Sequence, residues 1–184
     1  MNIDVHTHYV PRDSLEMAGR IGARHGLEMQ TTERGYTVLL RDGKPFLTQA
    51  KAEFSDLDLR LSIMDQQGVD LQVLSPAGSY FFYWMAAADS LEYARWLNDR
   101  LADAVAKFPQ RFVALASVPM QDPARAAVEL ERVMNQLGFR AQRSPRISMA
   151  AISTTRLWNR FGRQRRVSMR SFSFIPIRSS APSA

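Results

Sequence analysis

Hydrophobic and polar positions along the first 139 residues form a regular succession of strand and helix patterns. Short apolar runs at 3–5, 69–74 and 112–118 predict buried strands. Segments whose apolar residues recur every three or four positions, bounded by Ser or Asp before and Gly or Pro after, predict helices at 14–25, 55–68, 90–108 and 122–138. This order of strands and helices predicts a parallel α/β protein.

A predicted hairpin interrupts the succession after the first helix. The apolar segments 36–40 and 45–48 flank the tetrapeptide RDGK at 41–44. Asp-Gly tolerates the positive φ angles of a tight turn, so the two segments are expected to pair as a β-hairpin.

Composition changes abruptly near residue 140. Residues 1–139 hold all 18 acidic residues and 14 basic ones, a net charge of −4, whereas residues 140–184 hold ten arginines and no acidic residue. We therefore divide the chain into a folded part, 1–139, and an Arg- and Ser-rich tail, 140–184, expected to be disordered or misfolded. A nucleic-acid-binding tail is the alternative from another functional class, with affinity that falls as salt rises; we consider nucleic acid the less favoured partner.

The remaining features of the composition bear on domain size and on the cellular compartment. With 184 residues and 46% hydrophobic content, the chain suffices for one domain with a core. No segment is long and apolar enough to span a membrane, and the first residues do not form an apolar signal stretch. The absence of cysteine fits a reducing compartment, so we expect a cytoplasmic protein without a membrane partner.

The opening sequence MNIDVHTHYVPRD contains the candidate chemistry. Residues i and i+2 of a strand point to the same side, so His6 and His8 can aim their rings at one point while Thr7 faces away. Two converging imidazoles make half of a metal site. A pair of structural or surface histidines is the alternative. His25, the third histidine, lies at a helix end and is not expected to be a ligand.

The pattern hydrophobic-Asp-hydrophobic-His-x-His resembles the first strand of the amidohydrolase superfamily. The stretches RDGKPF, DLDLRLSIMDQQGVDLQVLSP, YFFYW, LNDRLADAVAKFPQRFVALASVPMQDP and AAVELERVMNQLGF resemble its aminocarboxymuconate-semialdehyde decarboxylase-like branch over about 1–139. This resemblance implies the N-terminal part of a (β/α)8 TIM-type barrel, about three β/α units with a hairpin insertion. It also implies a divalent metal, usually Zn2+, and a decarboxylase of unsaturated or aromatic carboxylic acids, with hydrolases among the relatives and homodimers possible.

The sequence also departs from that family. The family's third metal histidine, its catalytic histidine and its late aspartate have no counterparts here, so we name no catalytic residue and expect weak metal binding from His6 and His8. Leu47 occupies the place of an arginine that grips a substrate carboxylate, and the nearby Lys51 does not reproduce a bidentate fork. The substrate therefore stays open, and we expect this chain to be a truncated, inactive copy.

Other candidates receive structural interpretations. The aromatic run at 80–84 either lines the barrel mouth over a substrate or packs its loop onto the barrel rim. Arg60 can form a structural ion pair, and no chemistry is assigned to it. Three aspartates are expected to be caps or surface charges: Asp65, Asp70 and Asp89.

The genetic code offers an explanation for the tail. When codons are formed from the last base of one codon and the first two of the next, residues after 140 permit Gly-x-Asn-Leu-Asp-Asp-Pro-x-Leu-Glu-Pro-Phe-Trp, which resembles the family's continuation. Further on, 172–177 permit an apolar run followed by His-Pro-His. We hypothesise that residues from about 140 onward are a frameshifted reading, which the DNA sequence would test.

Overall fold

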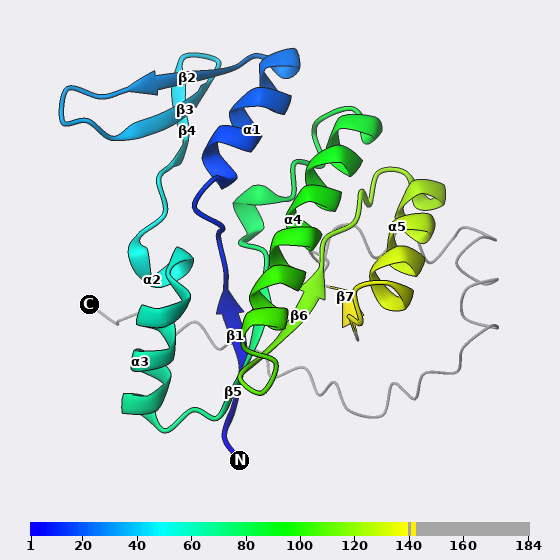
Figure 1. Ribbon diagram of the computed structural model, residues 1–184. Helices are drawn as coiled ribbons and strands as arrows, with labels where there is room; N and C mark the ends of the chain where they lie inside the picture. Colours follow the sequence, from blue (N-terminus) through cyan, green and yellow to red (C-terminus); the bar gives the residue numbers. More distant parts are fainter. Residues whose placement is uncertain (140, 143–184) are drawn as a thin grey trace, which may run out of the picture.

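The computed structural model describes residues 1–139 and 141–142, and Figure 1 shows their arrangement. The elements, in chain order, are β1 (Ile3–His8), α1 (Ser14–Gly22), the 3-10 helix η1 (Ala23–His25), β2 (Leu27–Thr31), β3 (Thr37–Arg41), β4 (Lys44–Thr48), α2 (Ala52–Ser55), α3 (Leu57–Gln67), β5 (Leu71–Ser75), η2 (Gly78–Tyr80), α4 (Ala87–Lys107), β6 (Phe112–Ala116), α5 (Pro123–Asn135) and β7 (Ala141–Gln142). The expectations for the tail and for a frameshift fall on 140 and 143–184, outside the described residues.

The main sheet is parallel, with strand order β1-β5-β6-β7. Helical connections join its successive strands, and α4 packs against β6 and α5 (Figure 1). Parallel strands joined by helices in this order form the beginning of a (β/α)8 barrel, as predicted.

A second, antiparallel sheet of order β2-β3-β4 lies beyond α1 (Figure 1). Its β3–β4 turn has positive φ angles at Asp42 (52°) and Gly43 (70°), which confirms the predicted hairpin. The sheet also contains β2, which the sequence pattern did not predict. The sheet approaches α1 so closely that a Cβ on Gly22 would lie 2.3 Å from Leu27 Cδ1.

Helix ends explain why the predicted helices form where they do. Asp56 caps α3, because its Oδ1 accepts from the amides of Asp58 and Leu59 at 3.0 Å. Gly68 ends the same helix in a left-handed conformation, φ 66°. The four predicted helices are present with shifted ends: the segment 14–25 is α-helical to Gly22 and continues as η1, α3 starts at Leu57, and α4 begins at Ala87, three residues earlier than expected.

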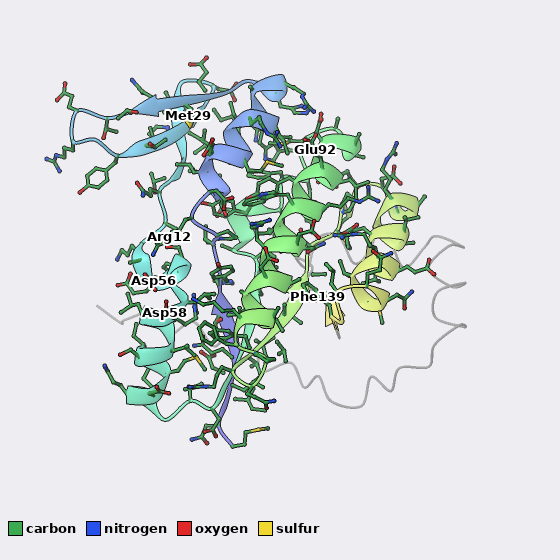
Figure 2. All side chains as sticks on the ribbon, viewed as in Figure 1. Arg12, Met29, Asp56, Asp58, Glu92 and Phe139 are labelled. Carbon is green, nitrogen blue, oxygen red and sulfur yellow. The ribbon has the colours of Figure 1, made fainter. Side chains whose placement is uncertain are left out.

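The core lies between the main sheet and its helices. Leu74, Leu101 and Phe112 are completely buried there, and Phe139, 5% exposed, packs against the same core (Figure 2). The aromatic run belongs to this core, since Phe82 lies 4.6 Å from Tyr93 between ring centroids. The contacts therefore support packing for this run, while Tyr80 also lines a cavity beyond the end of β1. Within the described part of the chain, no helix has the length and apolarity needed to cross a bilayer.

Candidate metal centre

The two histidines of β1 converge as the alternation predicts. Their ring centroids lie 5.4 Å apart with an interplanar angle of 70°, and Thr7 between them is 6% exposed and buried on the other side of the strand. Two imidazoles bound to one cation through nitrogens about 2 Å from it have centroids about 5 Å apart. The spacing of His6 and His8 is therefore compatible with two ligands of one metal ion.

A bulge in β1 gives this part of the strand its shape. Asp4 pairs with Gln72 and Thr7 with Leu74, so β1 contains one residue more than β5 between the two pairs. Asp4 Oδ1 accepts the amide of His6 at 3.1 Å within the irregular segment. Bulges redirect side chains next to functional sites, and here the extra residue sets the side on which His6 emerges.

Ser75, at the end of β5, orients the second histidine. Its hydroxyl donates to the Thr7 carbonyl at 2.7 Å, and its oxygen lies 3.1 Å from His8 Nδ1. Because the hydroxyl hydrogen points to Thr7, the contact with His8 has Nδ1–H as the donor, so that Nε2 carries the lone pair suited to a metal. Sequence reasoning missed Ser75, although it follows the run 69–74 directly and so ends the strand next to β1.

Arg60 of α3 forms a hydrogen bond with the backbone at the end of β1. Its Nη2 donates to the backbone carbonyls of His8 at 2.7 Å, Glu53 at 2.9 Å and Phe54 at 3.4 Å, and its Nη1 donates to Gln72 Oε1 at 3.1 Å. The ion pair considered for Arg60 is not formed among the described residues, where backbone carbonyls and an amide take the place of a carboxylate. Burial lowers the pKa of the Arg60 guanidinium below its usual range.

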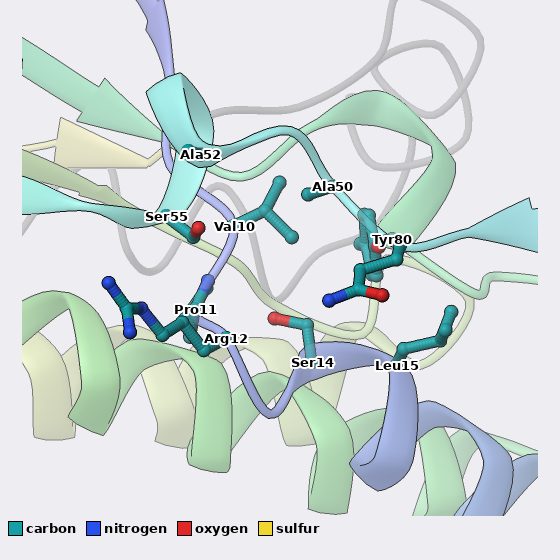
Figure 3. Close-up of a pocket in the computed structure, with 10 residues that line it drawn as sticks. Val10, Pro11, Arg12, Ser14, Leu15, Ala50, Ala52, Ser55 and Tyr80 are labelled. Atoms are coloured by element: carbon teal, nitrogen blue, oxygen red, sulfur yellow. The ribbon is translucent and has the colours of Figure 1, made fainter. Parts of the chain in front are cut away.

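A cavity of about 250 Å³ lies just beyond the carboxyl end of β1 (Figure 3). Arg12 and Tyr80 lie at its opposite ends (Figure 3), and Arg12 pairs with Asp56 at 2.7 Å (Figure 2). Its lining mixes polar and apolar side chains: Val10, Pro11, Arg12, Ser14, Leu15, Gln49, Ala50, Ala52, Ser55 and Tyr80. Leu47 is not among them, because it packs in the core at 6% exposure.

The remaining candidates lie outside this centre. His25 Nε2 contacts Asp89 Oδ2 at 2.7 Å at the end of η1, consistent with a helix-terminal role. Asp65 pairs with Arg111 and Asp70 accepts the Asn2 amide, so these aspartates act as surface charges, as expected.

The donor set around the histidine pair is incomplete. Among residues 1–139 and 141–142, no group of three or more His, Cys, Asp or Glu side chains is placed to hold a metal ion. After Glu131 the sequence contains none of these four residue types. His6 and His8 thus fit two positions of a coordination sphere whose other positions the described residues do not fill.

Comparison with known proteins defines the class. Residues 3–166 match the amidohydrolase family, and the chain belongs to that family. It is 32% identical over 139 residues to 2-amino-3-carboxymuconate-6-semialdehyde decarboxylase of Dictyostelium discoideum, covering 76% of this chain and 38% of the relative. It is 47% identical over 88 residues to gamma-resorcylate decarboxylase of a Polaromonas strain, covering 45% of this chain and 25% of the relative.

A solved structure supports the fold. Dihydroxybenzoic acid decarboxylase from Polaromonas, with bound manganese and the inhibitor 2-nitroresorcinol, has a TM-score of 0.55 and 28% identity, covering 77% of this chain and 38% of that chain. The predicted family and barrel class are confirmed. The chain spans well under half the length of these relatives, and the family match extends to residue 166, past the predicted limit at 139.

Proposed function

We propose that residues 1–139 form the metal-binding part of a carboxy-lyase that removes CO2 from an aromatic or unsaturated carboxylic acid. The observation that carries the proposal is the convergence of His6 and His8, with ring centroids 5.4 Å apart, at the carboxyl end of the first barrel strand. In (β/α)8 enzymes this end of the barrel holds the chemistry. The relatives compared above are named decarboxylases, which favours a lyase.

The reaction breaks the C–C bond to a carboxylate, releases CO2 and places a proton on the carbon that is left. A divalent cation, when bound, supplies positive charge that stabilises the negative charge developing in this step. His6 and His8 would hold that cation, and Ser75 would keep His8 in the tautomer that binds it. No residue of this chain is proposed as the proton donor.

The cavity that follows β1, whose lining does not include His6 or His8, is of suitable size for such a substrate. A cavity of about 150 Å³ accepts benzene, and the present one measures about 250 Å³, enough for a ring with polar substituents. The Arg12 side chain, at one end of the cavity, is paired with Asp56. A substrate carboxylate or phenolate can bind Arg12 by taking the place of Asp56 in this pair. Leu47 has an apolar side chain and is buried in the core, so it offers no hydrogen bond to a substrate carboxylate.

The identity of the cation is part of the proposal. Imidazole ligands suit zinc, whereas manganese, bound in the similar Polaromonas enzyme, prefers a larger share of oxygen ligands. With two imidazoles as its protein ligands, we propose zinc as the tighter-binding ion for this chain and expect low affinity for both metals.

Metal titration of the purified chain tests the site. Calorimetry with zinc and manganese should detect weak binding that His6→Gln and His8→Gln abolish. His25→Gln removes the third histidine, which lies at the end of η1, and should leave binding unchanged. Equal zinc binding in wild type and His6→Gln would refute the site.

Substrate assays test the reaction class. CO2 release from dihydroxybenzoates and muconate-like acids is measured with this chain and with the polypeptide encoded when the alternate frame after codon 140 is read. We expect turnover only from the latter, since the frameshift hypothesis assigns the missing donors to that frame. Hydrolysis of an ester or amide without CO2 release would favour the hydrolase alternative, which the family also allows.

A further inference from the structure

Arg60 reaches both candidate ligands by hydrogen bonds. Directly, its Nη2 donates to the His8 carbonyl at 2.7 Å. Indirectly, its Nη1 donates to Gln72 Oε1 at 3.1 Å, Gln72 Nε2 donates to Asp4 Oδ2 at 3.2 Å, and Asp4 Oδ1 accepts the His6 amide at 3.1 Å. The indirect route ends within the irregular segment between Asp4 and Thr7, and the direct route ends just after it, at His8.

The bulge explains why this segment needs such support. An extra residue in a strand interrupts the regular ladder, so the backbone around it depends on side chains for its hydrogen bonds. Arg60 is only 6% exposed, and its Nη2 also donates to the carbonyls of Glu53 and Phe54, which further fixes the guanidinium. A planar fork that bonds several acceptors at once is a property of arginine that lysine lacks.

We propose that Arg60, acting through Gln72 and Asp4, is a positioning residue that holds His6 and His8 in the convergent arrangement required by a divalent cation. The role of the cation rests on the proposed function, whereas the placement of the two rings can be measured without any metal. Outer partners of metal ligands typically contribute about 10- to 100-fold to metal affinity.

Arg60→Met tests the proposal, and Arg111→Met is its matched control. Arg111 also donates to backbone carbonyls, those of Asp70 at 2.9 Å and Val69 at 3.1 Å, but at the start of β5, away from the histidines. For each variant, NMR measures contacts between the His6 and His8 ring protons and the hydrogen exchange of the His6 amide. Zinc titration and urea unfolding are recorded on the same samples.

Arg60→Met should lose the ring–ring contacts and the protection of the His6 amide, and should bind zinc about tenfold or more weakly. Arg111→Met should keep the ring–ring contacts, the protection of the His6 amide and the zinc affinity, even if its free energy of unfolding falls as much as that of Arg60→Met. Gln72→Met cuts only the indirect route, so it should expose the His6 amide while His8 keeps its contact with Arg60. This second variant decides the question if Arg60→Met does not fold.

Two results would overturn the proposal: ring contacts and zinc affinity unchanged in both Arg60→Met and Gln72→Met, or equal losses in Arg111→Met. A wild-type protein that shows the ring contacts, loses them in Arg60→Met and yet binds no zinc would support the positioning role. It would at the same time refute the metal site of the proposed function, so the two failures are distinguishable.

Discussion

Glu129 of α5 is a fully buried carboxylate that joins α4 to α5. It accepts hydrogen bonds from Asn98 at 2.8 Å, Arg95 at 3.0 Å and Arg132 at 2.8 and 2.9 Å. Asn98 in turn donates to the Ser117 carbonyl and accepts the Ser117 amide, which fixes the chain after β6. The hydrogen bonds from Arg132 to Glu129 hold the pKa of this arginine above its usual range.

Glu129→Ala should therefore be strongly destabilising. Removing one partner of a buried charge pair typically costs about 3–5 kcal/mol. The side chains of Arg95 and Arg132 are 46% and 21% exposed, so both can recruit water when the carboxylate is gone. We expect the lower end of that range, a loss of about 3 kcal/mol in the free energy of unfolding. Glu129→Gln keeps an acceptor for Asn98 and should lose about 1–2 kcal/mol.

Urea unfolding followed by far-UV circular dichroism measures both losses. Glu131→Ala provides the control, because Glu131 lies on the same helix with its side chain exposed, and its replacement should change stability by less than about 0.5 kcal/mol. Equal midpoints and slopes for Glu129→Ala and Glu131→Ala would refute the reasoning, since the buried network would then contribute nothing to stability.

Two further predictions concern pH and packing. The hydrogen bond from His25 lowers the pKa of Asp89; stability from this carboxylate is therefore present above the unfolded-state pKa, about 3.9, and is lost as pH falls through the lower folded-state value. Between pH 5 and pH 2 the melting temperature should fall less in Asp89→Asn than in wild type. Melting temperatures that fall equally with pH in both proteins would contradict the prediction. Gly22→Ala should lower the free energy of unfolding by about 1–3 kcal/mol, because its Cβ would lie 2.3 Å from Leu27, whereas Gly78→Ala, with no atom within 4 Å, should be neutral in the same urea assay.

The sequence predicted the parts of the fold that local patterns encode. Apolar periodicity located the strands and helices of the main sheet, and Asp42-Gly43 located the hairpin turn. The sequence pattern did not predict β2. Its five residues follow η1 almost directly, and its pairing partner β3 is separated from it by a loop. The alternation rule placed His6 and His8 on one side of β1, although His6 lies within the irregular segment between Asp4 and Thr7.

The partners of the histidines could not be read from the pattern. Ser75 faces His8 only because β1 and β5 pair in one particular register, and register between distant parallel strands is set by tertiary packing. For Arg60 the sequence suggested only an ion pair, because it does not show that helix α3 places this side chain next to the end of β1, where backbone carbonyls are its acceptors.

The register of β1 has a consequence for the order of folding. His8 meets Ser75, which is 67 positions later in the chain, while the intervening β2, β3 and β4 pair locally. Each doubling of a closed loop adds only about 0.6 kcal/mol of entropy cost, but non-local pairings form slowly. The small antiparallel sheet should therefore form early during synthesis, and the first strand should wait unpaired until β5 has been made.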